Sequence, residues 1–234
     1  TAFGGPLPED GIPEIDVGQD LINAAEPGLV GNTHPGFHAW GMGGSSPVGV
    51  AADWLTSVWG QNAGIYQCSP AAATAEEVAA NWLLGLLDLP RSASIGFVTG
   101  ATMAGFVCLA AARHDVLRRA GHDFDKDGLI GCPKISVFVG DDTHISNLAA
   151  LRYLGFGQKQ IVRIPTDTQG RMRVEMLRTE MQKETGPKIV LATAGHINSG
   201  AFDDFDQIAD LAKLHDAWLL VYCASAFGHG RCPN

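Results

Sequence analysis

The sequence predicts an α/β protein of three layers, in which helices cover both faces of a mostly parallel sheet. Short apolar runs alternate with helical patterns along the second half of the 234-residue chain. Each run is apolar at successive positions, which is typical of strands that are buried on both faces. Polar or glycine-rich loops follow the runs, and in such sheets ligands bind beyond the carboxyl ends of the strands.

Helices dominate the first part of the chain. Apolar residues at helical spacing predict three of them: Asp20–Ala25, Ala51–Trp59 and Ala71–Leu87. The segments between these helices are rich in glycine and proline, so they are predicted to be irregular.

Strands and helices alternate in the second part of the chain. The predicted strands are short apolar runs: Ile135–Val139, Ile161–Ile164, Lys188–Thr193 and Ala217–Tyr222. The predicted helices between them are Ile145–Leu154, Arg173–Thr185 and Asp203–His215. The polar segment Gly121–Pro133 is predicted to be a loop.

A corner of small residues, Thr99–Thr102, is the centre of the predicted ligand site. It joins an extended or strand-like run, Ile95–Val98, to a helix that continues to about Ala120. The first turn of a helix has free backbone N–H groups and the positive end of the dipole, so the corner predicts an anion site, typically for a phosphate. The hydroxyls of Thr99 and Thr102 are further donors, and a simple tight turn is the alternative interpretation.

Composition excludes several classes of partner. The net charge of −9 argues against nucleic acid or an anionic membrane as the main partner. No apolar run is long enough to span a bilayer, and the first residues do not resemble a signal peptide. Five cysteines without a CxxC spacing predict free thiols, so we expect a cytoplasmic protein.

Sequence patterns for metals and nucleotides are incomplete. Asp123–Gly128 resembles the start of a calcium loop, but Lys134 stands where the bidentate glutamate belongs. No zinc spacing is present, so no metal is predicted. The chain also lacks GxGxxG and GxSxG, which disfavours a nucleotide-binding domain and a serine nucleophile.

Seven stretches, taken together in their order and spacing, resemble the pyridoxal-phosphate-dependent group II amino acid decarboxylases. That family has the aspartate aminotransferase fold, also called fold type I. The stretches are HPGF at His34–Phe37, CSPAAATAEE at Cys68–Glu77, GFVTGATMAGF at Gly96–Phe106, DDTHISN at Asp141–Asn147, LGFG at Leu154–Gly157, ATAGHINSGAFDD at Ala192–Asp204 and AWL at Ala217–Leu219.

The resemblance implies a cofactor, pyridoxal 5'-phosphate, and residues that bind it. The implied cofactor-binding residues are Gly100, Ala101, Thr102, His144, His196, Asn198 and Asp203. Gly100, Ala101 and Thr102 would hold the phosphate, and His144 would stack on the pyridine ring and act as the catalytic residue that steers protonation. His34 and Phe37 would lie at the substrate mouth, across the interface of a homodimer. The implied substrate is an amino acid.

The sequence departs from the family pattern near its carboxyl end. An ungapped count puts Tyr222 where the family has the aspartate that pairs with the pyridine nitrogen, and an alternative anchor puts Ala224 there. The lysine that binds the cofactor covalently lies further downstream in the family. We therefore expect a truncated or altered carboxyl terminus, an incomplete large domain over residues 61–234, and an N-terminal segment, 1–60, with dimer and mouth contacts.

Three functions follow from these expectations. The first is a decarboxylase whose 234-residue chain alone has little activity because it lacks the lysine. The second is a catalytically inactive chain that keeps the fold and the dimer surface. The third is a lyase that uses the same cofactor for a retro-aldol cleavage of a carbon–carbon bond.

Overall fold

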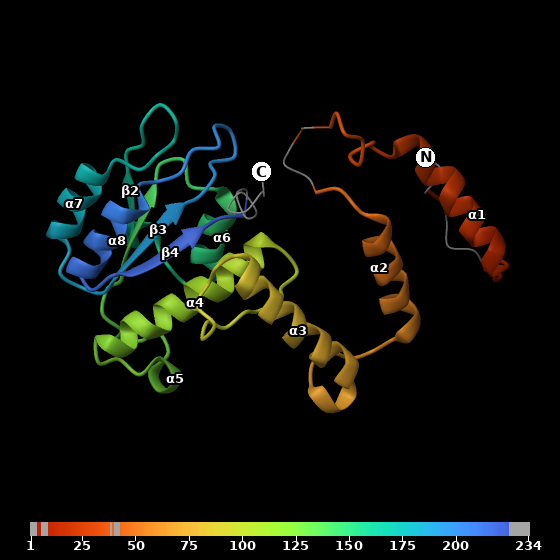
Figure 1. The fold of residues 1–234 in the computed structure, drawn as a ribbon, viewed down its shortest axis with the longest axis horizontal. Coiled ribbons are helices and arrows are strands. Elements are labelled where there is room, and N and C mark those ends of the chain that lie inside the picture. The colour runs from red at the N-terminus through yellow and green to blue at the C-terminus, as the bar shows by residue number, and fades with distance from the viewer. Residues whose placement is uncertain (1–3, 6–8, 38, 40–42, 225–234) are drawn as a thin grey trace. The chain divides into compact units, whose positions relative to one another are not determined.

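A computed structural model describes residues 4–5, 9–37, 39 and 43–224 of the chain. It confirms the predicted α/β architecture (Figure 1). Four parallel strands form one sheet in the order β2-β1-β3-β4. Their bounds are β1 Ser136–Gly140, β2 Ile161–Ile164, β3 Lys188–Thr193 and β4 Trp218–Tyr222.

One face of the sheet is covered by α4 (Ala101–Arg119) and α6 (Ile145–Tyr153). Alternate strand residues, including Val137, Ile189 and Leu220, share a buried apolar cluster with these two helices. Because side chains alternate along a strand, every second residue of the buried strands belongs to this face.

The other face is covered by α7 (Val174–Lys183) and α8 (Phe205–Leu214). Phe138 and Val190, which neighbour each other in the strand register, pack there against the two helices. The central strands are thus buried on both sides, which explains their continuous apolar sequences.

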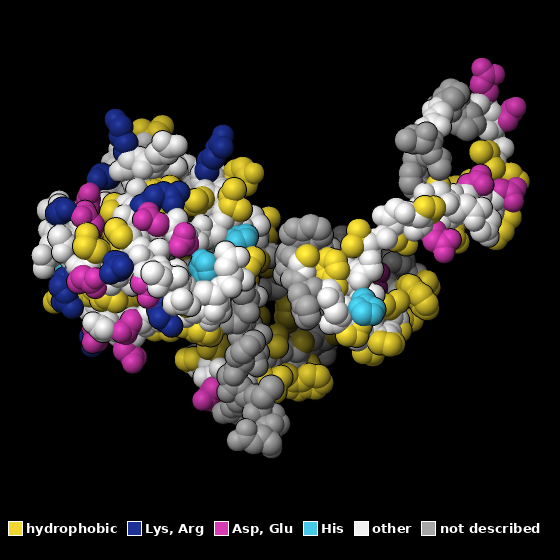
Figure 2. All heavy atoms as spheres, turned by 90° about the horizontal axis from the view of Figure 1, so that it is seen from above, with side chains coloured by type: hydrophobic (Ala, Val, Ile, Leu, Met, Phe, Trp, Pro, Cys, Tyr) yellow, Lys and Arg dark blue, Asp and Glu magenta, His cyan; other side chains and the backbone are white. Residues whose placement is uncertain are grey.

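The chain divides into two compact units, Thr1–Gln61 and Asn62–Asn234. The first contains α1 (Glu14–Ala25), α2 (Pro47–Trp59) and a 3₁₀ turn, Glu26–Gly28. Neither helix has a buried residue, and apolar side chains are exposed along both (yellow in Figure 2).

The second unit contains the sheet and the remaining helices. Besides α4, α6, α7 and α8 it has α3 (Pro70–Leu86) and the short α5 (Phe124–Asp127). Two 3₁₀ turns, Tyr66–Cys68 and Gln158–Gln160, complete it.

Three local predictions differ from the structure. Ile95–Val98 is not a strand, because these residues pair with none of the four strands and remain irregular. The first helix begins at Glu14 instead of Asp20, with Glu14 and Asp16 favourably placed in its first turn. The predicted loop Gly121–Pro133 contains α5, whose start is capped by the Asp123 carboxylate.

Four cysteines lie in the described part of the chain. Cys68, Cys108, Cys132 and Cys223 are free thiols. Across the described part of the chain, no helix has the length and apolar character needed to cross a membrane. The same residues contain no cluster of three or more side chains suited to a metal ion.

Candidate functional site

The N-terminus of α4 is open to solvent. Gly100 caps the helix, and the first backbone hydrogen bond runs from the Ala104 N–H to the Gly100 carbonyl. The N–H groups of Ala101, Thr102 and Met103 precede that bond, so the helix itself gives them no acceptor. All three residues are exposed. The corner predicted from the sequence can therefore receive an anion.

A hollow of about 430 Å³ lies at this corner. It is lined by two residues that precede α4, by the first turns of α4 and by one residue of α6: Thr99, Gly100, Ala101, Thr102, Met103, Phe106 and Tyr153. The two helices approach closely at Gly105, where a Cβ atom would lie 3.0 Å from the Asn147 Oδ1 atom. This close contact explains how α6 reaches the corner. Tyr153 is not among the site residues that the sequence predicts.

His144 lies at the start of α6, in the loop that follows β1. Its Nδ1 atom accepts a hydrogen bond from the Ser146 N–H at 3.3 Å and lies 2.7 Å from the Ser146 hydroxyl. The imidazole ring stacks on the phenol ring of Tyr222 with a centroid distance of 5.9 Å and an interplanar angle of 14°. His144 is thus an N-cap with one ring face against an aromatic partner.

His144 does not line the hollow at the corner. It caps the first turn of α6, whereas Tyr153, which does line the hollow, is the last residue of that helix. The predicted convergence of the corner and His144 on one ligand therefore remains a prediction.

The loop Gly195–Gly200 contains two of the predicted cofactor residues. The His196 ring packs on Gly170, where an added Cβ atom would lie 2.8 Å from the ring. Asn198 is exposed, and its N–H donates to His196 Nδ1 at 3.3 Å. The Ser199 hydroxyl donates to the Gln169 carbonyl at 2.6 Å. The loop is therefore held against the turn around Gly170.

Asp203 is buried and has two backbone partners. One carboxylate oxygen accepts the Met172 N–H and the other accepts the Thr193 N–H, both at 2.7 Å. Burial raises the pKa of the Asp203 carboxyl, and these two hydrogen bonds oppose the rise. The arrangement gives Asp203 a positioning role, since it ties the end of β3 to the segment before α7.

His34 and Phe37 belong to the first unit. The His34 Nδ1 atom accepts the Gly36 N–H at 3.0 Å, and the Phe37 N–H donates to the His34 carbonyl at 2.9 Å. These bonds form a local turn. The role of both residues at a substrate mouth remains a prediction.

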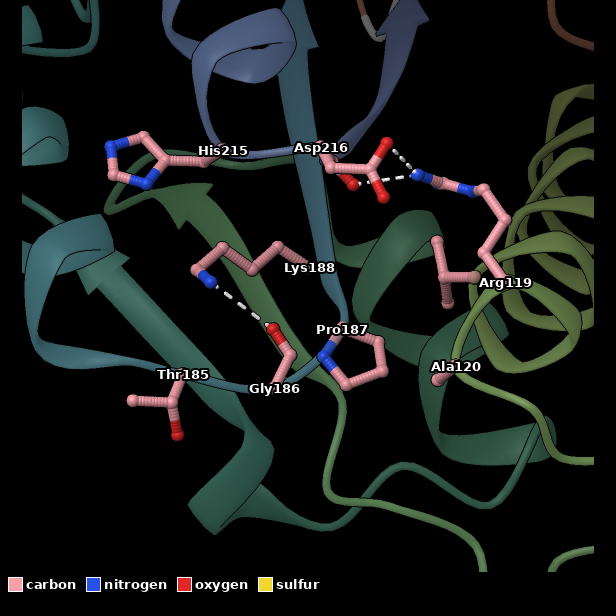
Figure 3. A pocket seen from close by; sticks show the side chains of 9 residues that line it. Arg119, Ala120, Thr185, Gly186, Pro187, Lys188, His215 and Asp216 are labelled. Carbon is pink, nitrogen blue, oxygen red and sulfur yellow. Dashed lines mark hydrogen bonds and ion pairs between the residues drawn. The ribbon is translucent and has the colours of Figure 1, made fainter.

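A second cavity, of about 240 Å³, lies near the beginning of β3 (Figure 3). Lys188 lines it and donates to the Gly186 carbonyl at 3.1 Å, while Arg119 pairs with Asp216. Burial lowers the pKa of the Lys188 amine, a property that would favour a nucleophile. However, Lys188 is the first residue of β3, so it lies at the amino ends of the parallel strands. His144 follows β1 and Tyr222 is the last residue of β4, so both lie at the opposite, carboxyl ends.

Comparison with known proteins decides the family. Residues 6–234 match the family described as "Pyridoxal-dependent decarboxylase conserved domain". The chain belongs to this family.

Two curated members of the pyridoxal-dependent decarboxylase family illustrate the similarity. The aromatic-L-amino-acid decarboxylase of Bacillus atrophaeus is 34% identical over 80% of this chain and 37% of its own length. Tryptophan decarboxylase 1 of Oryza sativa subsp. japonica is 32% identical over 92% of this chain and 45% of its own length. The chain thus spans less than half the length of these two relatives.

Solved structures of pyridoxal-dependent decarboxylases have the same fold. The crystal structure of Oryza sativa TDC with PLP matches with a TM-score of 0.81 and 30% identity. The match covers 92% of this chain and 48% of the Oryza sativa chain. The glutamate decarboxylase domain from Vibrio parahaemolyticus has a TM-score of 0.85 at 24% identity, and the match covers 96% of this chain and 50% of the Vibrio chain. At this low identity the match is evidence for the fold only. The expected fold type I is confirmed, and the chain spans about half the length of each of these two structures.

The residues at the start of α4 are suited to bind the phosphate group of a phosphorylated aromatic ligand. The α4 N-terminus offers backbone N–H groups and the Thr102 hydroxyl beside an open hollow. His144 offers an aromatic surface, although Tyr222 covers one face of its ring. None of the described residues that line the hollow is a lysine.

Proposed function

We propose that this chain forms part of a pyridoxal-phosphate-dependent lyase that decarboxylates an amino acid. The observation that carries the proposal is the open N-terminus of α4 in a chain of this family. The N–H groups of Ala101 and Thr102 and the Thr102 hydroxyl bind the phosphate, and Gly100 lets it approach closely. Pyridoxal phosphate supplies an electron sink for the bond broken at the α-carbon of the substrate.

In this proposal His144 supplies a flat surface and a proton donor. Its Nδ1 atom accepts the Ser146 N–H, which leaves the proton of the neutral ring on Nε2. The Nε2–H group can then donate to a ligand. His196 and Asn198 border the ligand through the loop that Asp203 positions.

The amino-acid substrate and the dimer are further parts of the proposal. The relatives include an aromatic-L-amino-acid decarboxylase and a tryptophan decarboxylase, so we propose an amino acid substrate of this broad class. His34 and Phe37, in the segment 1–60, would contact substrate across a homodimer. The segment 61–234 would be the cofactor-binding part.

A second candidate is a chain that binds the cofactor but does not turn over substrate. Two observations favour it for the 234-residue polypeptide: Tyr222 stands at the counted position of the acid, and no lysine is among the described residues that line the hollow at α4. Binding would then be reversible and would depend on the phosphate.

One experiment tests both candidates. The 234-residue protein is incubated with pyridoxal phosphate or with pyridoxal, with and without L-tryptophan. Binding, borohydride-trapped lysine adducts and released carbon dioxide are measured. We expect phosphate-dependent binding without an adduct or turnover. Turnover would contradict inactivity of this polypeptide alone, and failure to bind pyridoxal phosphate would contradict the proposed function.

A further inference from the structure

The stacked pair of His144 and Tyr222 leaves no space between its rings. Their centroids are 5.9 Å apart and their planes differ by 14°. Because stacked carbon atoms prefer separations of about 3.5 Å or more, a third ring inserted between two others needs about 7 Å. A planar ligand therefore cannot enter between these two side chains.

The backbone of Tyr222 is fixed at the end of β4. Tyr222 is paired in register with Thr193, and its carbonyl accepts the Ala194 N–H at 2.8 Å. The side chain is half-buried, and its hydroxyl lies 3.4 Å from that of Ser146. The ring also packs against the apolar cluster between the sheet and the helices α4 and α6.

Ser146 contacts both the Tyr222 hydroxyl and the His144 imidazole. A backbone N–H can only donate, so the 3.3 Å bond from Ser146 makes His144 Nδ1 an acceptor. The Ser146 hydroxyl lies 2.7 Å from Nδ1 and donates to the Tyr222 hydroxyl at 3.4 Å. Tyr222 thus contacts His144 by stacking and, through Ser146, by a chain of hydroxyl groups.

We propose that Tyr222 is a specificity-determining residue, because its ring occupies the face of His144 on which a planar phosphorylated ligand would otherwise stack. This inference rests on the proposed function, in which the phosphate site at the N-terminus of α4 and the ring of His144 bind the same ligand. A ligand with an aromatic ring has to displace Tyr222 to reach that face, whereas a ligand that needs only the helix N-terminus does not. Tyr222 therefore lowers the preference of the site for aromatic phosphates.

The test compares two ligands in three proteins. Wild-type protein, Tyr222→Ala and Tyr222→Phe are titrated with pyridoxal phosphate and with inorganic phosphate, and the backbone amide signals of Ala101 and Thr102 are followed by NMR. Stacked aromatic pairs have modest energies, so we expect Tyr222→Ala to bind pyridoxal phosphate about three- to tenfold more tightly than wild type. Tyr222→Phe keeps the ring and should match wild type. Inorganic phosphate should bind all three proteins equally.

The possible failures are distinguishable. Equal or weaker binding of pyridoxal phosphate by Tyr222→Ala, with phosphate binding unchanged, would overturn this inference and leave the phosphate site intact. If neither pyridoxal phosphate nor inorganic phosphate binds to any of the three proteins, the proposed function and this inference are both overturned. If Tyr222→Ala does not fold, as judged by circular dichroism, Tyr222→Leu takes its place with the same expected result.

Discussion

The carboxylate of Asp203 accepts the backbone N–H of Thr193, the last residue of β3, at 2.7 Å. Its other oxygen accepts the Met172 N–H at the same distance. One buried side chain thus joins the end of a central strand to the segment that leads into α7. Thr193 neighbours Tyr222 in the sheet, so this bond also supports the strand end beside the His144 ring.

Asp203→Asn is expected to destabilise the fold. An amide has one oxygen, so its NH₂ group would face a backbone N–H donor and leave a buried group without an acceptor. We expect a loss of about 1–3 kcal/mol in the free energy of unfolding, measured by urea denaturation. Asp204→Asn is the control, because Asp204 caps α8 and asparagine caps equally well. Equal effects of the two substitutions would contradict the positioning role of Asp203.

Gly170→Ala should disturb the loop that contains His196. Gly170 has a φ of +82°, and an added Cβ atom would lie 2.8 Å from the His196 ring. Gly200 has a φ of +71° with open space around it, so Gly200→Ala carries only the backbone cost of about 1 kcal/mol. We expect Gly170→Ala to cost about 1–3 kcal/mol more, because the His196 ring must move. Equal melting temperatures for the two variants would show that His196 does not pack there.

Lys188 should make stability depend on pH. Burial lowers the pKa of its amine below the ordinary value of 10.5, so the unfolded chain binds this proton more tightly than the folded protein. The free energy of unfolding contributed by Lys188 therefore rises as pH increases toward 10.5. Relative to Lys188→Met, wild-type protein should gain stability between pH 7 and pH 10 in urea titrations. A constant difference between the two proteins would show that the amine is not perturbed.

Local patterns predicted the sheet well. The bounds of β2 and β3 agree with the predicted Ile161–Ile164 and Lys188–Thr193, because buried parallel strands have continuous apolar sequences between clear turns. The run Ile95–Val98 is equally apolar but is not a strand, since pairing depends on a neighbouring edge that a local pattern does not reveal. The position of α4 was predicted from its small-residue corner.

The candidate site was predictable in part. The corner at Thr102 and the cap at His144 follow local rules for helix starts, so sequence spacing identified them. The contacts of Tyr222 and Asp203 depend on which strands are neighbours, and the order β2-β1-β3-β4 is a property of the tertiary fold. Ser146 could have been noticed, because a hydroxyl two residues after an N-cap lies within reach of its side chain.

The central claim is that free N–H groups at the start of α4 bind a phosphate. Ala101 is the first residue of the helix, a position where proline is tolerated and removes one N–H donor. The decisive measurement is the ratio of pyridoxal phosphate affinity to pyridoxal affinity in wild-type protein and in Ala101→Pro. We predict that the ratio falls about tenfold in Ala101→Pro while thermal stability is retained. An unchanged ratio in a folded variant would contradict the claim.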